Sequence, residues 1–229
     1  REGDLVDNPF APLTAAEIDK AVAIFRREQK GDNAVFCSSG LDEPAKADVK
    51  AGKSVPRIVK FLGTDSAPDG GFEVYVNLDD DKIERLIRLG NDAQAPYGYY
   101  DLGVAVQLTK SNPEWLSAVK ARGIACETEK DLERIQIDPW PAGGYADAEV
   151  PAGHRALRCI AFVREDETDN GYARPIHGVI CHVDVTAGQV VRVEDTGVVP
   201  MPPNPGRFDA AHQDSARTDL KDLEITQPD

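Results

Sequence analysis

The chain carries the same pattern twice, and this repetition limits the folds it can adopt. In each half, a segment with helix signals precedes four short runs rich in β-formers, which clusters of Gly, Pro and Asp separate. The runs are NAVFCSSGL, RIVKFLG, FEVYVNL and KIERLIRL, then DLERIQID, ALRCIAFVRED, PIHGVICHVDV and QVVRVEDTGVV. We therefore expect an α+β fold with one unit near 1–95 and another near 96–205. Each unit should be a helix on an antiparallel sheet of about four strands.

Helix signals open the first half. Thr14 and Glu17 have the spacing of a capping box, and Leu13 and Ile18 that of a hydrophobic staple. Gly31 follows the apolar stripe at the place where a helix would end. These signals predict one helix that begins near residue 14.

Two helix signals open the second half. In the prediction for the second helix, Asn112 is the N-cap, Pro113 is the first helical residue and Gly123 lies just past the end. The other helix of this half comes before Asn112, and three of its residues share one face: Tyr100, Val104 and Leu108.

The strand period of two predicts which side chains enter the cores. The core positions expected in the two units are Val74, Val76 and Leu78, then Val179, Cys181 and Val183. His182 and Asp184 fall on the opposite face of the same strand.

Charge and cysteine content exclude several classes of function. The sequence has 26 Lys and Arg residues and 40 Asp and Glu residues, so its net charge of −14 repels nucleic acid phosphates and anionic lipids. No run approaches the roughly 18 apolar residues of a membrane helix. The four cysteines have no CxxC spacing and are interpreted as buried thiols: Cys37, Cys126, Cys159 and Cys181. Free thiols favour a cytoplasmic location, and the compartment stays otherwise unknown.

The stretch REDETDNGYARPIHGVICHVDV, residues 164–185, gathers acids, a tyrosine and two histidines. His177 and His182 fall on opposite faces of one strand and so cannot bind one metal ion together. Asn170-Gly171 is typical of a hairpin turn with positive φ. We interpret the stretch as a hairpin and Tyr172 as folded over its base.

Other candidate sites have simpler explanations. APDGG (67–71) and NPG (204–206) lack the Lys-Ser/Thr ending of a phosphate loop and are predicted to be turns. In YGYYDLG (97–103), Asp101 is expected to cap a helix. Ser38 and Ser39 have no base nearby, and His154 is distant in sequence. We therefore predict no catalytic, cofactor-binding or metal-binding residue in this chain.

Several segments resemble one enzyme family. DPWPAGGY (138–145), AFVREDETDNGYARPIHGVICHVDVTAGQVVRVEDTGVVPMPP (161–203) and RTDLKDLEITQP (217–228) resemble the N2 and N3 domains of copper-containing primary-amine oxidases. The second half matches N3. PLTAAEIDKAVAIFR (12–26) is similar to the opening helix of N2, and 28–90 matches only in outline.

The resemblance implies a fold and a place for the chemistry. It implies two cystatin-like domains in a homodimeric enzyme that converts primary amines to aldehyde, ammonia and hydrogen peroxide. Copper ligands, an Asp base and the tyrosine that becomes topaquinone would lie in a separate catalytic domain. This chain has no Asn-Tyr pair and no His-x-His, so none of those residues can be assigned here.

The resemblance leaves two functions open. The chain could be the non-catalytic N2/N3 portion that supports a catalytic domain, in the same polypeptide or in another chain. The alternative is a free-standing binding module with the same architecture. An unrelated enzyme with a site between the units is disfavoured because no convergent polar motif is present.

The C-terminal segment departs from the family pattern. The family has Gly-Asn-Tyr after its Pro-Pro pair, whereas this chain has PPNPGRFD with Arg207, Phe208 and Asp209. Residues 206–229 are expected to be an extended linker toward the catalytic domain, with Leu220, Leu223 and Ile225 held against another surface. Cys126 lies in a short insertion relative to the family and receives no role.

Overall fold

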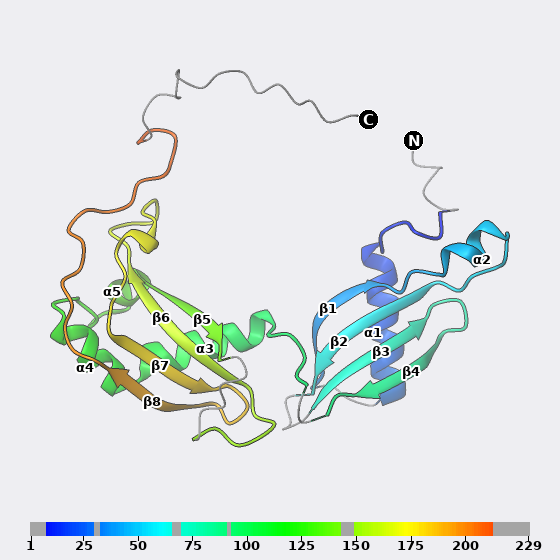
Figure 1. Ribbon diagram of the computed structural model, residues 1–229, viewed down its shortest axis with the longest axis horizontal. Coiled ribbons are helices and arrows are strands. Elements are labelled where there is room, and N and C mark those ends of the chain that lie inside the picture. The colour runs from blue at the N-terminus through cyan, green and yellow to red at the C-terminus, as the bar shows by residue number, and fades with distance from the viewer. Residues whose placement is uncertain (1–7, 30–32, 66–69, 91–92, 143–148, 213–229) are drawn as a thin grey trace.

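The computed structural model describes residues 8–29, 33–65, 70–90, 93–142 and 149–212, and it contains two α+β units (Figure 1). The elements of the first unit are α1 (Ala15–Gln29), β1 (Val35–Leu41), α2 (Lys46–Lys50), β2 (Ile58–Thr64), β3 (Gly71–Asn77) and β4 (Lys82–Arg88). The elements of the second unit are α3 (Tyr99–Ser111), α4 (Pro113–Ala121), α5 (Glu129–Glu133), β5 (Ile135–Pro141), β6 (Ala156–Val163), η1 (Gly171–Ala173), β7 (Val179–Asp184) and β8 (Gln189–Asp195). None of the helices in these described ranges is long and apolar enough to cross a bilayer.

The two units share one topology. Each sheet is a four-stranded antiparallel meander, in the order β1-β2-β3-β4 and β5-β6-β7-β8. Each last strand has a bulge at the corresponding place, which leaves Glu84 unmatched in β4 and Val191 unmatched in β8. Each turn before that strand ends on a residue with positive φ, Asp81 at 55° and Gly188 at 66°. The predicted duplication is therefore confirmed, and it includes the positions of the bulge and of the positive-φ turn residue in each sheet.

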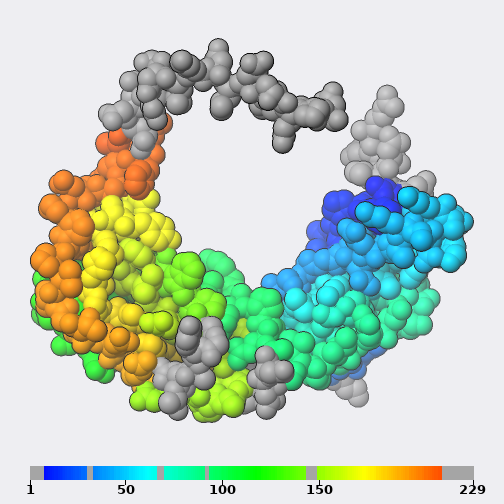
Figure 2. All heavy atoms as spheres, in the orientation of Figure 1, coloured from blue at the N-terminus to red at the C-terminus, as the bar shows by residue number. Residues whose placement is uncertain are grey.

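One face of each sheet is covered by helices. Helix α1 packs on the first sheet, and α3 and α4 pack on the second (Figure 1). The described parts of the two units meet at one end and form a crescent (Figure 2). Each unit has a separate hydrophobic core between its helices and its sheet.

The predicted core residues are buried. In β3 and the turn after it, Val74, Val76 and Leu78 are at most 6% exposed. In β7, Val179, Cys181 and Val183 are at most 1% exposed. In the first core, the Phe25 ring lies 5.1 Å from Phe36 and stacks 5.2 Å from Phe72. His182 is paired in the sheet with Arg158 and Arg192 and contacts Glu194 of β8, away from the core. The period-two prediction for β7 is confirmed.

The predicted caps are present. Thr14 Oγ1 accepts the Glu17 N–H at 3.2 Å, while the Glu17 carboxylate accepts the Thr14 N–H at 2.7 Å. Asn112 Oδ1 accepts the Trp115 N–H at the start of α4, and Gly123 takes a φ of +74° just after it. Gly31 lies outside the described residues.

Three expectations about helices need correction. The buried stripe of α3 is Asp101, Ala105 and Thr109, one residue beyond the predicted face. Small side chains on this stripe let the helix approach the sheet closely. The run DLERIQID is not all strand, because Thr128 and Asp131 form a capping box that starts α5, and β5 begins only at Ile135. Helix α2 has no buried residue and carried no amphipathic signal.

Candidate functional site

The connection between β6 and β7 is longer than a two-residue hairpin turn. It runs from 164 to 178 and contains η1, whose N-cap Asn170 accepts the Tyr172 N–H at 3.0 Å. The expected positive φ at Asn170-Gly171 is wrong, since Gly178 adopts it instead (φ +75°). Gly171 is closely packed: a Cβ there would lie 3.0 Å from Gln136 Oε1 and 3.2 Å from Phe162 Cβ. The strands still pair in the antiparallel manner of a hairpin.

Tyr172 folds back onto β5 and β6. Its ring meets the Phe162 ring edge-on at 4.8 Å, and its hydroxyl donates to Asp138 Oδ2 at 2.7 Å. Trp140 follows two residues after Asp138 in the edge strand β5, so it lies on the same side of that strand. Both aromatic side chains are 59% exposed. This gives the second unit an exposed aromatic surface held by a polar contact.

The histidines do not converge. His182 Nε2 lies 3.2 Å from Glu194 Oε2, and His154 Nδ1 lies 2.6 Å from the buried Asp184 Oδ2. His177 is exposed, and its carbonyl accepts from Arg122. Within the described ranges, no group of three or more His, Cys, Asp and Glu residues could hold a metal ion. His154 is engaged with Asp184, and Ser38 and Ser39 are exposed on β1.

Asp101 caps α3, as predicted, and it also binds Arg155. Its carboxylate accepts the Gly98 N–H at 2.8 Å and accepts from Arg155 Nη2 at 2.8 Å and Nε at 3.3 Å. Arg155 also donates to the carbonyls of Ala95 and Pro96. The side chains of this ion pair are only 6% and 8% exposed. The pair therefore ties the connection between the units to α3 and to the start of β6.

The first unit contains the equivalent of this pair. Arg57 precedes β2 as Arg155 precedes β6, and its Nε donates to Glu17 Oε1 at 2.7 Å. Its Nη2 donates to the Pro12 carbonyl at 3.2 Å. Sequence reasoning missed both pairs. The signal that could have found them is the shared spacing Pro-x-Thr-x-x-Glu at 12–17 and Pro-x-Gly-x-x-Asp at 96–101.

The Glu17 carboxylate should make stability depend on acidic pH. The hydrogen bonds from Arg57, opposed by burial and aided by Thr14, lower the pKa of Glu17 from 4.5 to about 2. Its contribution is thus complete above pH 4.5 and is lost as pH falls toward 2. Because the pair is partly exposed, we expect Glu17→Gln to cost about 1 kcal/mol of unfolding free energy at pH 7. The difference between the two proteins should vanish near pH 2 in urea titrations, and a constant difference would contradict this assignment.

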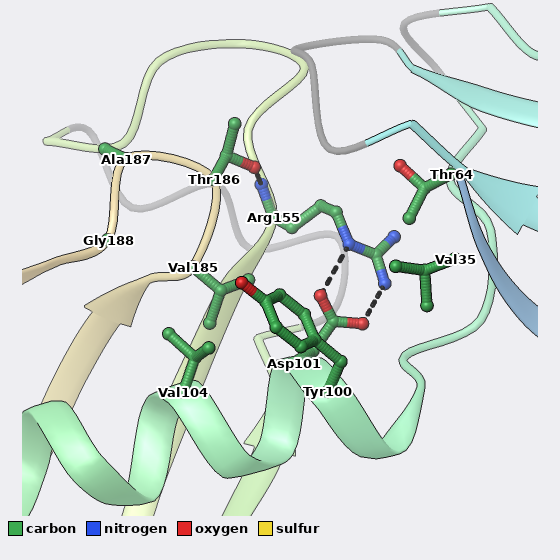
Figure 3. A pocket seen from close by; sticks show the side chains of 10 residues that line it. All are labelled: Val35, Thr64, Tyr100, Asp101, Val104, Arg155, Val185, Thr186, Ala187 and Gly188. Atoms are coloured by element: carbon green, nitrogen blue, oxygen red, sulfur yellow. Dashed lines mark hydrogen bonds and ion pairs between the residues drawn. The ribbon is translucent and has the colours of Figure 1, made fainter. Parts of the chain in front are cut away.

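A cavity of about 230 Å³ lies at the joint between the units (Figure 3). Val35 and Thr64 contribute from the first unit, and Tyr100, Val104 and the turn 185–188 contribute from the second. Figure 3 shows the Arg155 guanidinium turned toward the Asp101 carboxylate beside Val35. Because Asp101 and two carbonyls already use this guanidinium, the joint is best explained as a structural contact.

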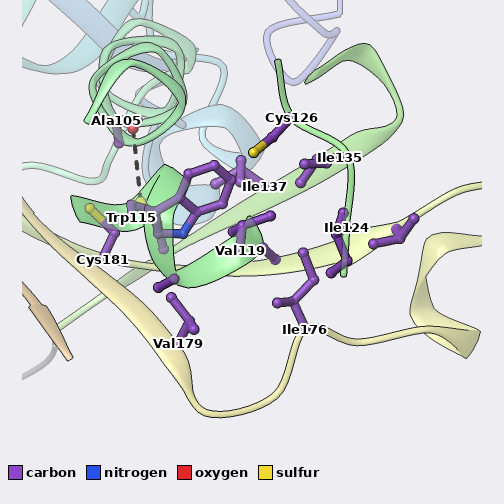
Figure 4. Close-up of a cluster of buried hydrophobic side chains, with 14 of the residues drawn as sticks. Ala105, Trp115, Val119, Ile124, Cys126, Ile135, Ile137, Ile176, Val179 and Cys181 are labelled. Carbon is purple, nitrogen blue, oxygen red and sulfur yellow. Dashed lines mark hydrogen bonds between the residues drawn. The ribbon is translucent and has the colours of Figure 1, made fainter. Parts of the chain in front are cut away.

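The cysteines are thiols in the described structure. Cys126 and Cys181 are buried in the second core (Figure 4). Cys159 is buried too, as predicted, whereas Cys37 is only half-buried. Burial raises the pKa of Cys159 to about 12, with a smaller opposing effect of Thr109. Cys126 Sγ donates to the Leu116 carbonyl at 3.6 Å, so the apparent insertion serves the core of the second unit.

The C-terminal segment is bound to the connection between β6 and β7 as far as residue 207. Asn170 N–H donates to the Gly206 carbonyl at 2.8 Å, and Gly206 N–H donates to Asp169 Oδ1 at 2.8 Å. Arg207 forms a bidentate ion pair with Asp166, at 2.9 and 2.6 Å, which holds the pKa of that carboxyl well below its usual range. The departure from the family pattern therefore has a structural role. Leu220, Leu223 and Ile225 lie outside the described residues.

Replacing Arg207 should loosen this attachment without unfolding the unit. In Arg207→Ala we expect the amides of Asn170 and Gly206 to exchange hydrogen about threefold faster, because an exposed ion pair contributes modestly. Amides in β7 should be unaffected. Hydrogen exchange followed by NMR measures both, and unchanged exchange at Gly206 would contradict the role assigned to Arg207.

Comparison with known proteins places the chain in one family. Residues 101–211 match the model of the copper amine oxidase N3 domain. The chain is 33% identical over 225 residues to a primary amine oxidase of Arthrobacter sp. (strain P1), covering 98% of this chain and 34% of that protein. It is 29% identical to a histamine oxidase of Arthrobacter globiformis, covering 97% of this chain and 32% of that protein.

A solved structure has the same fold. The copper-containing benzylamine oxidase of Hansenula polymorpha superposes with a TM-score of 0.69 at 15% identity, over 96% of this chain and 37% of that chain. The chain thus spans about a third of the length of the curated relatives it matches. We conclude that the chain belongs to the copper amine oxidase family and that residues 101–211 form the N3 domain of that family.

Proposed function

We propose that the chain is the non-catalytic N2/N3 portion of a copper- and topaquinone-dependent primary-amine oxidase. The observation that carries the proposal is that almost the whole chain aligns with only a third of such enzymes. In this proposal, residues 1–95 are an N2-like domain, 96–205 an N3-like domain and 206–229 the linker toward the catalytic domain. The parent enzyme is a homodimer that produces aldehyde, ammonia and hydrogen peroxide.

The proposal assigns the chemistry to another portion of the enzyme. Within the described residues, no cluster of three ligands could hold copper, and Tyr99 and Tyr100 stand exposed at the start of α3. In this proposal, copper and topaquinone belong to the remaining portion of the enzyme, as in the copper amine oxidases that the chain resembles. No catalytic residue is assigned to this chain, and nucleic acid and membrane are not among its proposed partners.

The supporting role has a candidate surface. Trp140 and Tyr172 expose aromatic area on the second unit, and Phe208, 64% exposed, follows the segment bound beside η1. Exposed aromatic groups next to polar anchors are typical of protein interfaces. This surface is suited to contact the catalytic domain.

Association with a catalytic portion tests the proposal. The chain is mixed with the part of the Arthrobacter sp. (strain P1) enzyme that lies outside the alignment, and binding is measured by calorimetry. We expect a one-to-one complex that Trp140→Ala and Tyr172→Ala weaken, while Tyr75→Ala, on the first sheet, leaves binding unchanged. Absence of any complex, even with the catalytic part of the parent enzyme, would favour a free-standing binding module.

A further inference from the structure

A second cavity lies at the far end of the second unit, away from the joint. Its volume is about 240 Å³. It is lined by the backbone after α4, the end of α5 with the start of β5, the end of β6, the β6–β7 connection and the C-terminal segment. The side chains that matter for its chemistry are Asp131, Arg134, Arg174 and the apolar group Ile124, Ile135, Val163 and Met201.

The arginines at this end form no close ion pair among the described residues, although Arg134 interacts electrostatically with Asp131. Among the described residues, no carboxylate lies within ion-pair distance of Arg134, Arg164 or Arg174, although the chain carries 14 net negative charges. Arg134 Nε donates to the Arg164 carbonyl at 3.2 Å, and Arg164 Nη2 donates to the Glu133 carbonyl at 3.0 Å. The Nε atoms of Arg164 and Arg174 are buried with no hydrogen-bond partner among the described residues. Arg174 lines the cavity, where a water molecule or a ligand could accept from its Nε.

The rest of the wall restricts which acceptor fits. Ile124, Ile135 and Val163 are at most 8% exposed and give the cavity an apolar side. Asp131 adds one negative charge, and the hydrogen bonds from Thr128 lower the pKa of this carboxyl. A doubly charged anion would be repelled by Asp131, whereas one carboxylate on an apolar group matches both sides of the cavity.

The duplication of the fold supports this end as a binding surface. The start of β1 and the end of β2 are the corresponding end of the first unit, and Val35 and Thr64 there face the second unit across the joint. What faces them is the start of α3, where the Tyr100 ring lies beside the Asp101 carboxylate (Figure 3). In the second unit, Met201 is the residue of the C-terminal segment, within its described part, that lines the cavity at the equivalent end.

We propose that this cavity binds a carboxylate carried by a short apolar group, with Arg174 and Arg134 as the groups that recognise the charge. The inference is independent of the proposed function, because it concerns only the donors and the shape of this chain. The carboxylate could belong to a free organic acid or to an acidic side chain of a polypeptide, and the two sources share this chemistry.

NMR of the arginine Nε–H groups of the whole chain tests the proposal. The probes are 3-methylbutanoate, its neutral counterpart 3-methylbutanamide, a terminally blocked Asp-Phe dipeptide and inorganic phosphate. We expect saturable shifts of the Arg174 Nε–H signal with at least one carboxylate probe, and none with the amide. Tighter binding of 3-methylbutanoate identifies a free acid as the source, and tighter binding of the dipeptide identifies a polypeptide side chain.

Variants distinguish specific recognition of the carboxylate by these arginines from a general effect of the positive charge of the chain. Arg174→Met and Arg134→Met should each weaken the carboxylate about tenfold, since each removes charge-assisted hydrogen bonds. Lys50→Met, which removes the same charge from the exposed helix α2, should leave the affinity unchanged. If the NMR spectrum of Arg174→Met shows that this variant is unfolded, the affinity of Arg134→Met for the carboxylate alone tests the proposal. No saturable shift with either carboxylate, equal binding of the amide, or tighter binding of phosphate would overturn the proposal.

Discussion

Replacing Arg155 with methionine should lower the free energy of unfolding by about 3–5 kcal/mol, because it leaves the Asp101 carboxylate buried without a counter-charge. The Asp101 side chain is 8% exposed, and its remaining donor in the described structure is the Gly98 N–H. The same change frees the carbonyls of Ala95 and Pro96 in the connection between the units. Urea denaturation with linear extrapolation measures the loss.

The matched control is the equivalent pair of the first unit. Arg57→Met should cost only about 1 kcal/mol, since Arg57 and Glu17 are 20% and 26% exposed and water can replace the lost partner. The double variant Arg155→Met with Asp101→Asn should recover part of the stability, because the unpaired charge is then gone. Equal losses in Arg155→Met and Arg57→Met would contradict the importance of burial at the joint.

Replacing Trp115 with alanine should cost about 3–5 kcal/mol, as truncation of a large buried aromatic side chain does. Trp115 is fully buried at the centre of the second core, among Val119, Ile137 and Cys126 (Figure 4). Its Nε1 has no hydrogen-bond partner in the described part of the chain, so Trp115→Phe should cost clearly less than Trp115→Ala. Chemical denaturation followed by circular dichroism measures both variants.

Trp140→Ala is the control for aromatic truncation. Trp140 is 59% exposed on an edge strand, so its loss should change the free energy of unfolding by at most about 0.5 kcal/mol. A cost for Trp115→Ala below 1 kcal/mol, or equal to that of Trp140→Ala, would show that Trp115 does not anchor the second core.

Local signals in the sequence predicted most of the fold. The capping pair Thr14 and Glu17 and the cap at Asn112 act within three residues, and their chemistry is visible in the sequence itself. Alternation along β3 and β7 likewise identified buried positions, because neighbouring side chains of a strand point to opposite faces. The repeated set of four β-rich runs also predicted an antiparallel sheet of about four strands in each unit, as observed.

Contacts between distant residues could not be predicted in this way. Arg155 and Asp101 are 54 residues apart, and the cavity beside Arg174 is assembled from five separate stretches of the chain. The Asn-Gly signal failed because Gly171 has no positive φ and is instead closely packed, with Gln136 and Phe162 near the place of a Cβ. Helix α5 was missed because its single turn is too short to show a period.

Amine-dependent release of hydrogen peroxide by the purified chain, after incubation with copper, tests the central claim most directly. The account predicts no turnover with methylamine, histamine or benzylamine and no copper retained after dialysis, since the described residues offer no cluster of three metal ligands. Stoichiometric copper that survives dialysis, together with peroxide release from any primary amine, would contradict the assignment of this chain as the non-catalytic portion of an amine oxidase.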